Sequence, residues 1–329
     1  MTRSGRCSAR RETREMDTPS REALRRRLAQ LPLQRRRLAE RLLAGDEWLQ
    51  RAPSPDRSAS GGRYRTVLGD GKEWVRTFYD SVNASLDSGA AADYALFLNY
   101  GYSDGAHGGQ EDGRTRHRIN RNNERLVLEV IGDCVLDGAD VLDVGCGRGG
   151  TLDTISRHSA PRRLTGVDLS SHAIRFCRDR HRGADVNFVE GDAECLPFAA
   201  GAFDVVVNVE SSHSYPNRGS FYDEVARVLR AGGRFLYADL LPVRLEESCR
   251  RHLTTGGFAF ELARDITQNV LPSCRETAWV HRDAFAAEPI AGDLREFLSV
   301  PGSEVYREME AGASTYQIWR LRKSVGDQA

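Results

Sequence analysis

The sequence lacks the two signals that would place it in a membrane or outside the cell. Among its 329 residues, no apolar run approaches the roughly 20 that a helix needs to span a bilayer. The Arg-rich start also lacks the apolar core of a secretory signal peptide. These absences exclude a transmembrane protein, and we expect the chain to work in the cytoplasm, away from membranes.

Cysteine pairs are missing as well. The seven cysteines never form a C-x-x-C motif and their number is odd; they occupy positions 7, 134, 146, 177, 195, 249 and 274. This spacing predicts neither a disulfide framework nor a zinc site, and it fits a reducing compartment.

The chain has no overall excess of charge, because 47 Lys and Arg residues balance 47 Asp and Glu residues. The balance hides an asymmetry. Residues 1–63 hold 16 Arg and 8 acidic residues, net +8, which leaves 31 basic and 39 acidic residues, net −8, in the remainder. The sequence therefore indicates a basic arm followed by an acidic body.

The basic arm comprises residues 1–50. Its leucines at 24, 28 and 31, and then at 38 and 42, follow helical spacing that Pro32 interrupts, which predicts two short amphipathic helices. A solvated arm without a partner is an equal alternative. Residues 51–70 are expected to be a linker, since their first part is rich in Pro, Ser and Gly.

Residues 71–121 are expected to form an N-terminal lid. Large apolar residues recur every four positions from Trp74 to Leu86, which is typical of an amphipathic helix lying on a main domain. The following segment, 94–113, is first aromatic and then glycine-rich, a mixture more typical of a lid than of a core element.

Residues 122–329 alternate between helical and β-rich segments, which predicts a doubly wound, Rossmann-like α/β sheet. Five β segments are expected at 140–144, 164–168, 186–190, 203–209 and 233–239. Two further β patterns, at 258–263 and 315–321, would complete a seven-stranded sheet whose last strand is inserted antiparallel at the edge. The mainly helical insertion 265–314 is expected to cap the substrate site.

A glycine-rich loop follows the first predicted strand of this core. Gly145, Gly147 and Gly150 satisfy the G-x-G-x-x-G spacing where a strand turns into a helix, so the backbone there can approach a nucleotide closely. By spacing alone a nicotinamide or flavin dinucleotide is a live alternative.

Three acidic residues narrow the choice of nucleotide. Asp168 ends the second strand and would bind ribose hydroxyls in either cofactor class. Asp143, just before the glycine turn, would hold the amine of S-adenosylmethionine (SAM) but would repel a pyrophosphate. Asp192 can accept the adenine amino group while the amide of Ala193 donates to the ring. The alternative, in which these acids only cap helices and turns, is weaker for the set than for each one.

With these residues the sequence resembles the class I SAM-dependent methyltransferases. Further segments resemble the O-methyltransferases of polyketide and polyketide/peptide synthases and the enzymes that methylate phthiotriol-type lipids; these segments are 98–102, 126–133, 208–215 and 237–242, and the likeness spans roughly 72–323. The resemblance implies SAM as the cofactor. The residues expected to contact it are Asp143, Gly145, Cys146, Gly147, Asp168, Leu169, Asp192, Ala193, Asn208 and Tyr100.

The expected chemistry is in-line methyl transfer to oxygen, with removal of a hydroxyl proton. His213, after the fourth strand, is the predicted general base, since imidazole titrates in the useful range. Glu210 is expected to hydrogen-bond that imidazole as a His/Glu dyad, with a cofactor contact or a helix cap as an equal alternative. Tyr100 or Tyr102 would close over the sulfonium or simply pack in the lid.

No cluster of metal-binding carboxylates is recognisable, so metal-independent transfer is expected. The predicted substrate is a hydroxyl or enol of a polyketide or polyketide/peptide intermediate held on an acyl carrier protein. A released lipid-like natural product is the main alternative. The arm resembles docking segments of such synthases and would recruit the enzyme to a synthase module, although 16 arginines could also bind RNA phosphates. An RNA methyltransferase and an NAD-dependent reductase remain lesser alternatives.

Overall fold

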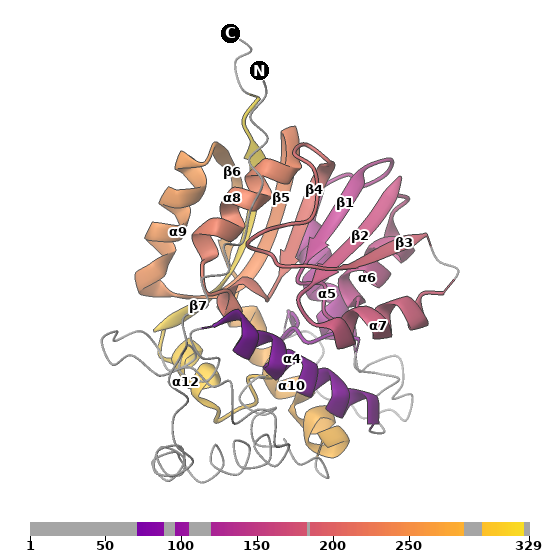
Figure 1. The fold of residues 1–329 in the computed structure, drawn as a ribbon. Coiled ribbons are helices and arrows are strands. Elements are labelled where there is room, and N and C mark those ends of the chain that lie inside the picture. Colours follow the sequence, from indigo (N-terminus) through magenta and orange to yellow (C-terminus); the bar gives the residue numbers. More distant parts are fainter. Residues whose placement is uncertain (1–70, 89–95, 105–119, 183–184, 286–297, 326–329) are drawn as a thin grey trace, which may run out of the picture. The chain divides into compact units, whose positions relative to one another are not determined.

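The computed structural model describes residues 71–88, 96–104, 120–182, 185–285 and 298–325 (Figure 1). The predicted arm and linker, residues 1–70, lie outside the described residues. So do much of the predicted lid, at 89–95 and 105–119, and part of the predicted cap, at 286–297.

Seven strands form one sheet in the order β3-β2-β1-β4-β5-β7-β6. They are β1 (Asp140–Val144), β2 (Arg163–Asp168), β3 (Val186–Glu190), β4 (Phe203–Val209), β5 (Leu229–Pro242), β6 (Phe258–Asp265) and β7 (Ser314–Lys323). β1 to β5 pair in parallel, and β7 pairs antiparallel with β5 and β6. The predicted doubly wound sheet is confirmed. One expectation is corrected. The last strand, β7, was expected at the edge of the sheet, but it lies between β5 and β6, and β6 forms the edge.

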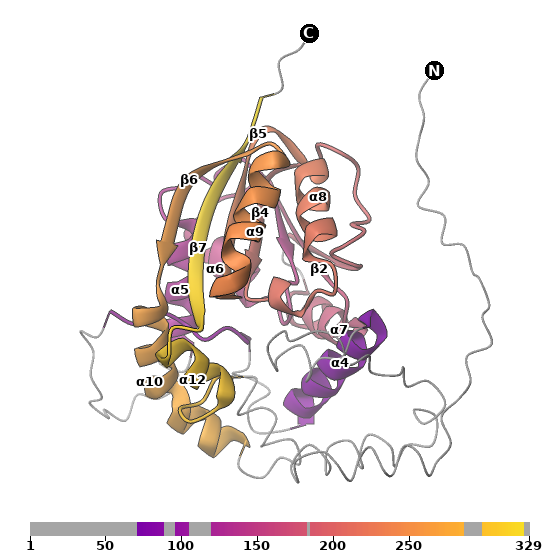
Figure 2. The same cartoon turned by 90° about the vertical axis from the view of Figure 1, so that its left-hand side faces the viewer.

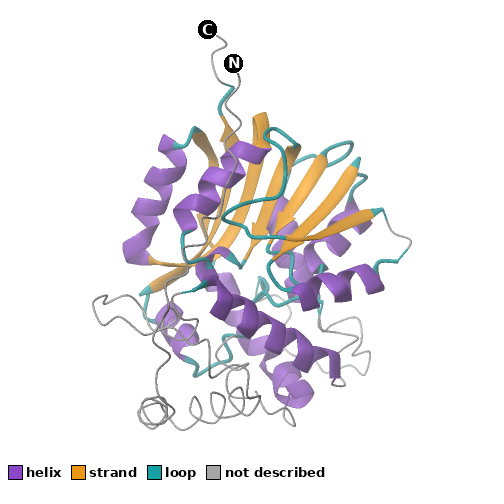
Figure 3. Cartoon of the chain, in the orientation of Figure 1, coloured by secondary structure: helices purple, strands orange, loops and turns teal. Residues whose placement is uncertain are grey.

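Helices cover both faces of this sheet (Figure 3). One face shares an apolar core with α5 (Arg121–Ile131), α6 (Gly150–His158) and α7 (Ser171–Arg180). The other shares a core with α8 (Arg218–Val228) and α9 (Val243–Thr255), of which α9 was not expected from the sequence. Because both faces are covered, the central strand β1 is buried at all five positions.

Side-chain caps set where two of these helices begin. The Ser170 hydroxyl accepts a hydrogen bond from the Ala173 amide at 3.1 Å at the start of α7. The side-chain Oδ1 atom of Asn217 accepts one from the Ser220 amide at 3.1 Å at the start of α8. Such caps satisfy amide groups that have no partner within the first turn. They hold the loops that precede α7 and α8 in place at the carboxyl ends of β2 and β4.

Elements from distant parts of the chain lie beyond the carboxyl ends of the parallel strands (Figures 1 and 2). α4 (Lys72–Ser88) runs across this end of the sheet close to α7. α10 (Thr267–Phe285) and α12 (Glu304–Glu310) lie at the same end of the sheet. Val82 and Leu86 of α4 pack with Leu298, so α4 contacts the region of the insertion. None of the described helices is both long and apolar enough to cross a membrane.

Candidate functional site

An open cavity lies at the carboxyl ends of β1, β2 and β4, under α4, and its empty space including the mouth measures about 990 Å³. The predicted site residues that line it are Gly145, Cys146, Gly147, Asp168, Leu169, Asp192, Ala193 and Glu210. The predicted site residues outside its lining are Asp143, Asn208, Tyr100 and His213.

The glycine loop forms the floor of the cavity. Gly145 and Gly147 have φ values of 72° and 51°, which side-chain-bearing residues rarely adopt. A Cβ atom at Gly145 would lie 2.7 Å from the Tyr215 hydroxyl oxygen, so the loop also packs too closely for a side chain. The tight turn leaves the backbone of residues 145–148 facing the cavity, as a nucleotide site requires.

Asp168, the predicted ribose ligand, is fixed by two backbone amides. Gly147 donates to its Oδ2 atom and Ser170 to its Oδ1 atom, both at 2.8 Å. Burial raises the pKa of Asp168, and these hydrogen bonds partly offset that rise. Each carboxylate oxygen has two lone pairs, so both oxygens retain capacity to accept ribose hydroxyls.

Asp143 and Asn208 lie buried beneath the loop. Asp143 is 1% exposed, and its Oδ2 atom has no hydrogen-bond partner in the described part of the chain. Burial, with the nearby charge of Asp168, raises the pKa of Asp143 to about 8. Asn208 donates to the Val144 carbonyl at 2.8 Å, and its own Oδ1 atom is likewise without a described partner.

These two buried acceptors decide whether SAM fits. A buried acceptor without a donor is costly, so its presence calls for a donor from elsewhere. The methionyl ammonium of SAM is such a donor and carries the charge that would restore ionisation of Asp143. The residues present therefore fit SAM, with Asp143 and Asn208 both beneath the loop rather than in the lining of the cavity.

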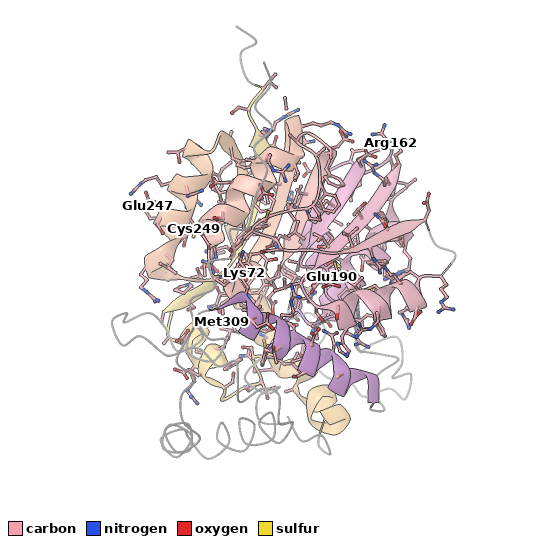
Figure 4. The ribbon with its side chains drawn as sticks, viewed as in Figure 1. Lys72, Arg162, Glu190, Glu247, Cys249 and Met309 are labelled. Atoms are coloured by element: carbon pink, nitrogen blue, oxygen red, sulfur yellow. The ribbon has the colours of Figure 1, made fainter. Side chains whose placement is uncertain are left out.

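Lys72 lines the cavity at the end formed by Asp192 and Glu194, and sequence reasoning missed it. Its Nζ atom lies 2.6 Å from Asp192 Oδ2 and 2.7 Å from Glu194 Oε2. Figure 4 shows Lys72 at the first turn of α4. Burial would lower the pKa of Lys72, but the two carboxylates raise it above its ordinary value. Lys72 is one of only two lysines in the chain, which was the one available signal.

Glu210 occupies the wall of the cavity beside β4. Its Oε2 atom accepts hydrogen bonds from the Tyr100 amide at 2.8 Å and from the Tyr316 hydroxyl at 2.7 Å. Burial raises the pKa of Glu210 well above its ordinary value, and the two hydrogen bonds oppose the rise. Its φ of 52° is unusual for a residue with a side chain, and such strain concentrates at functional sites.

The imidazole of His213 is held by Asp239, which corrects the predicted His213–Glu210 hydrogen bond. Nδ1 of His213 lies 2.7 Å from Asp239 Oδ1, and the two side chains are only 7% and 0% exposed. Glu210 instead bonds to residues of the lid segment and of β7. Asp239 comes one residue after Ala238, which pairs with Val209 at the end of β4, so it reaches the loop that carries His213.

The charge of Asp239 is stabilised in place. The Ser212 hydroxyl and the His213 amide donate to Asp239 Oδ2 at 2.6 and 2.9 Å. Burial alone would raise the pKa of Asp239, but the imidazole, the Arg218 guanidinium and these hydrogen bonds lower it below its ordinary value. The carboxylate is therefore ionised at neutral pH and orients the imidazole through Nδ1.

Comparisons with known proteins agree with this geometry. Residues 142–237 match the model of a methyltransferase domain family. The chain is 36% identical over 252 residues to a phthiotriol/phenolphthiotriol dimycocerosates methyltransferase of Mycobacterium tuberculosis, covering 72% of this chain and 89% of that protein. It is 40% identical over 237 residues to a fatty-acid O-methyltransferase of Mycolicibacterium smegmatis, covering 69% and 83%.

A solved structure shows the same fold. StiE O-MT residues 942–1257 align with a TM-score of 0.59 at 19% identity, over 78% of this chain and 92% of that one. The sequence relatives, rather than this likeness, exclude a dinucleotide-dependent reductase, and the cofactor of this chain is SAM. The chain belongs to the class I SAM-dependent methyltransferases.

Proposed function

We propose that this enzyme transfers a methyl group from SAM to a hydroxyl or enol oxygen of a polyketide or polyketide/peptide intermediate carried by an acyl carrier protein. The observation that carries the proposal is the buried His213–Asp239 pair next to the cofactor cavity. The named substrates of the relatives, a phthiotriol lipid and a fatty acid, and the O-methyltransferase structure support oxygen as the acceptor.

The pair supplies a base of defined tautomer. Because Asp239 is ionised and acceptor-only, Nδ1 of His213 carries the proton of their 2.7 Å hydrogen bond. Nε2 is then the basic nitrogen, and it takes the hydroxyl proton as the O–CH₃ bond forms. General base catalysis of this kind contributes about 10²–10⁴-fold to the rate. Bound SAM supplies the activated methyl group.

The charges around the cavity favour a neutral acceptor over a carboxylate. Among the residues that line it, the cationic side chains are Lys72 and Arg148. Lys72 bonds to the two acids at the adenine end, and Arg148 lies 3.5 Å over the Phe176 ring, next to α4. Glu210 is the ionisable group on the β4 side. An ionised fatty acid would meet no described cation there, whereas a hydroxyl needs the base that His213 provides.

The cofactor would be held by the loop and the acids around it. Asp168 would bind the ribose hydroxyls, and Asp192 with the amide of Ala193 would bind adenine. Asp143 would pair with the methionyl ammonium from below the loop. The remaining predicted contacts, from Gly145, Cys146, Gly147, Leu169, Asn208 and Tyr100, would shape the site through the backbone and through packing.

The test is intact-mass spectrometry of a 3-hydroxyacyl carrier protein incubated with SAM and enzyme. The same acyl group as a free thioester and a free fatty acid are run in parallel. A gain of about 14 Da, the mass of one CH₂ unit, on the carrier-bound substrate, lost in His213→Ala, supports the proposal. Methylation of the free thioester alone would assign the enzyme to released lipid-like products. Methylation of the fatty acid alone would overturn the hydroxyl proposal.

We also propose a cytoplasmic location and recruitment by residues 1–50, which the described residues do not include. Removing residues 1–50 should lower turnover of a synthase-bound carrier but leave turnover of an isolated carrier unchanged. Equal turnover with and without the arm would contradict recruitment. Salt-dependent binding of the arm to RNA would favour the nucleic-acid alternative.

A further inference from the structure

A third charged residue, Arg218, lies beside the His213–Asp239 pair. Its Nε atom donates to the Ser212 carbonyl at 3.2 Å, and a terminal nitrogen lies 3.8 Å from the sulfur of Cys249. Figure 4 labels Cys249 on α9. Within the described residues, no carboxylate lies within 4.0 Å of this guanidinium. The sequence analysis assigned Arg218 no role.

The position of Arg218 is unfavourable unless a negative charge compensates it. It is the first residue of α8, where the helix dipole opposes a cation, and it is partly buried. Burial would lower its pKa, but the phenols of Tyr237 and Tyr222 and the carboxylate of Asp239 raise it. Asp239 is the carboxylate in this set. Ser212 connects it to Arg218, because the Ser212 hydroxyl donates to Asp239 at 2.6 Å and the Ser212 main-chain carbonyl accepts from Arg218.

Several other titratable side chains surround the pair. They are Glu210 after β4, Tyr215 in the loop, Tyr222 on α8, Tyr237 on β5, Cys249 on α9 and Tyr316 on β7. Burial raises the pKa of each of the four phenols and of Glu210. Arg218 is therefore the cation that accompanies the ionised Asp239 beside the imidazole of His213.

We infer that Arg218 is a positioning residue that compensates the charge of Asp239, so that His213 rests as an uncharged base. This inference rests on the proposed function. In the reaction the neutral imidazole takes the hydroxyl proton, the O–CH₃ bond forms and the S–CH₃ bond breaks. The products are the methyl ether, S-adenosylhomocysteine and an imidazolium, which then loses its proton to water.

Without Arg218 the imidazole would be the main counter-ion of a buried carboxylate. Protonated imidazole would then be favoured before the substrate arrives, because an uncompensated buried charge is costly. A protonated imidazole cannot accept the hydroxyl proton, so the enzyme would work only at a pH high enough to deprotonate it. Arg218 thereby sets the acid side of the pH–rate profile.

The first test compares kcat/KM from pH 5.5 to 9.5 in wild type, Arg218→Met and Arg218→Lys. In the Met variant the acid limb should move up by about one pH unit, a roughly tenfold loss at pH 6 that vanishes at pH 9. The Lys variant keeps the charge and should stay close to wild type. Arg251→Met, which removes an exposed arginine of α9, should leave the profile unchanged. An equal loss at every pH in the Met variant would reduce Arg218 to a structural role and overturn the inference.

A second test does not depend on methyl transfer. The ring signal of His213 is followed by NMR with pH in ¹³C-histidine-labelled protein and assigned with His213→Asn. The titration midpoint should be higher in Arg218→Met than in wild type, and Arg218→Gln replaces the Met variant if that protein does not fold. A higher midpoint in the variant, without methylation of any tested substrate, would contradict the proposed function but support the role of Arg218. Methylation with an unchanged midpoint would support the proposed function but contradict the role of Arg218.

Discussion

Asp143 should make the stability of the free enzyme depend on pH. Its pKa is raised to about 8 by burial and by Asp168, whereas an unfolded Asp titrates near 3.9. The folded state therefore keeps a proton that the unfolded state has lost, and the free energy of unfolding falls as pH rises between these values. From pH 5.5 to 7.5 this group alone should cost wild type about 2.5 kcal/mol.

Asp143→Asn is nearly isosteric and removes the titration. Between pH 5.5 and 7.5 the free energy of unfolding of the variant, relative to that of wild type, should rise by about 2.5 kcal/mol. This change is equivalent to roughly 5–10 °C in Tm. Urea unfolding of both proteins at pH 5.5, 6.5 and 7.5, without cofactor, measures the difference. Saturating SAM should restore much of the wild-type stability at pH 7.5, because the ammonium favours ionised Asp143. The Asn variant should bind SAM more weakly.

Asp179→Asn serves as the matched control, because the Asp179 side chain is 68% exposed on α7. Its substitution should leave the pH dependence of unfolding unchanged. A stability difference between wild type and Asp143→Asn that stays constant with pH would refute the reasoning, since it would mean that the buried carboxyl does not titrate in this range.

Three further substitutions probe the site and the fold. Gly145→Ala should destabilise the protein by about 1–2 kcal/mol, because φ is 72° and the new Cβ meets Tyr215, and should weaken SAM binding; thermal unfolding and calorimetry would show both. Lys72→Met should lower SAM affinity by roughly two- to fivefold at low salt and less at high salt, since this ion pair is partly exposed; equal losses at both would contradict an electrostatic role. Ser303→Ala removes the cap of α12, whose hydroxyl accepts from the Tyr306 amide at 3.2 Å, and should cost about 1 kcal/mol in urea unfolding without changing kcat.

Local patterns in the sequence carry much of the fold and of the cofactor site. Alternating helical and β-rich segments predict the doubly wound sheet, because apolar periodicity reports which side of each element is buried. The glycine spacing around Gly145 and the acids at 168 and 192 lie at strand ends, where a parallel sheet brings its loops together. All of these residues line the observed cavity.

Such local patterns could not identify the hydrogen-bond partner of His213. Glu210 is three residues away and was the natural choice, but it takes a positive φ and bonds to Tyr316 on β7. Asp239 is 26 residues from His213 and meets it only because β5 pairs with β4. The same pairing brings Asp239 to Ser212, whose main-chain carbonyl accepts a hydrogen bond from Arg218.

The sequence by itself determined the class of the fold, the glycine loop and the acids expected to hold SAM, since each depends on residues close together in the chain. The tertiary structure decided which carboxylate orients the base, that Lys72 meets Asp192 from 120 residues away, and that the last strand lies inside the sheet edge. The physical reason is that hydrogen bonds and ion pairs depend on distances of a few ångströms, which sequence spacing does not report for residues on different elements.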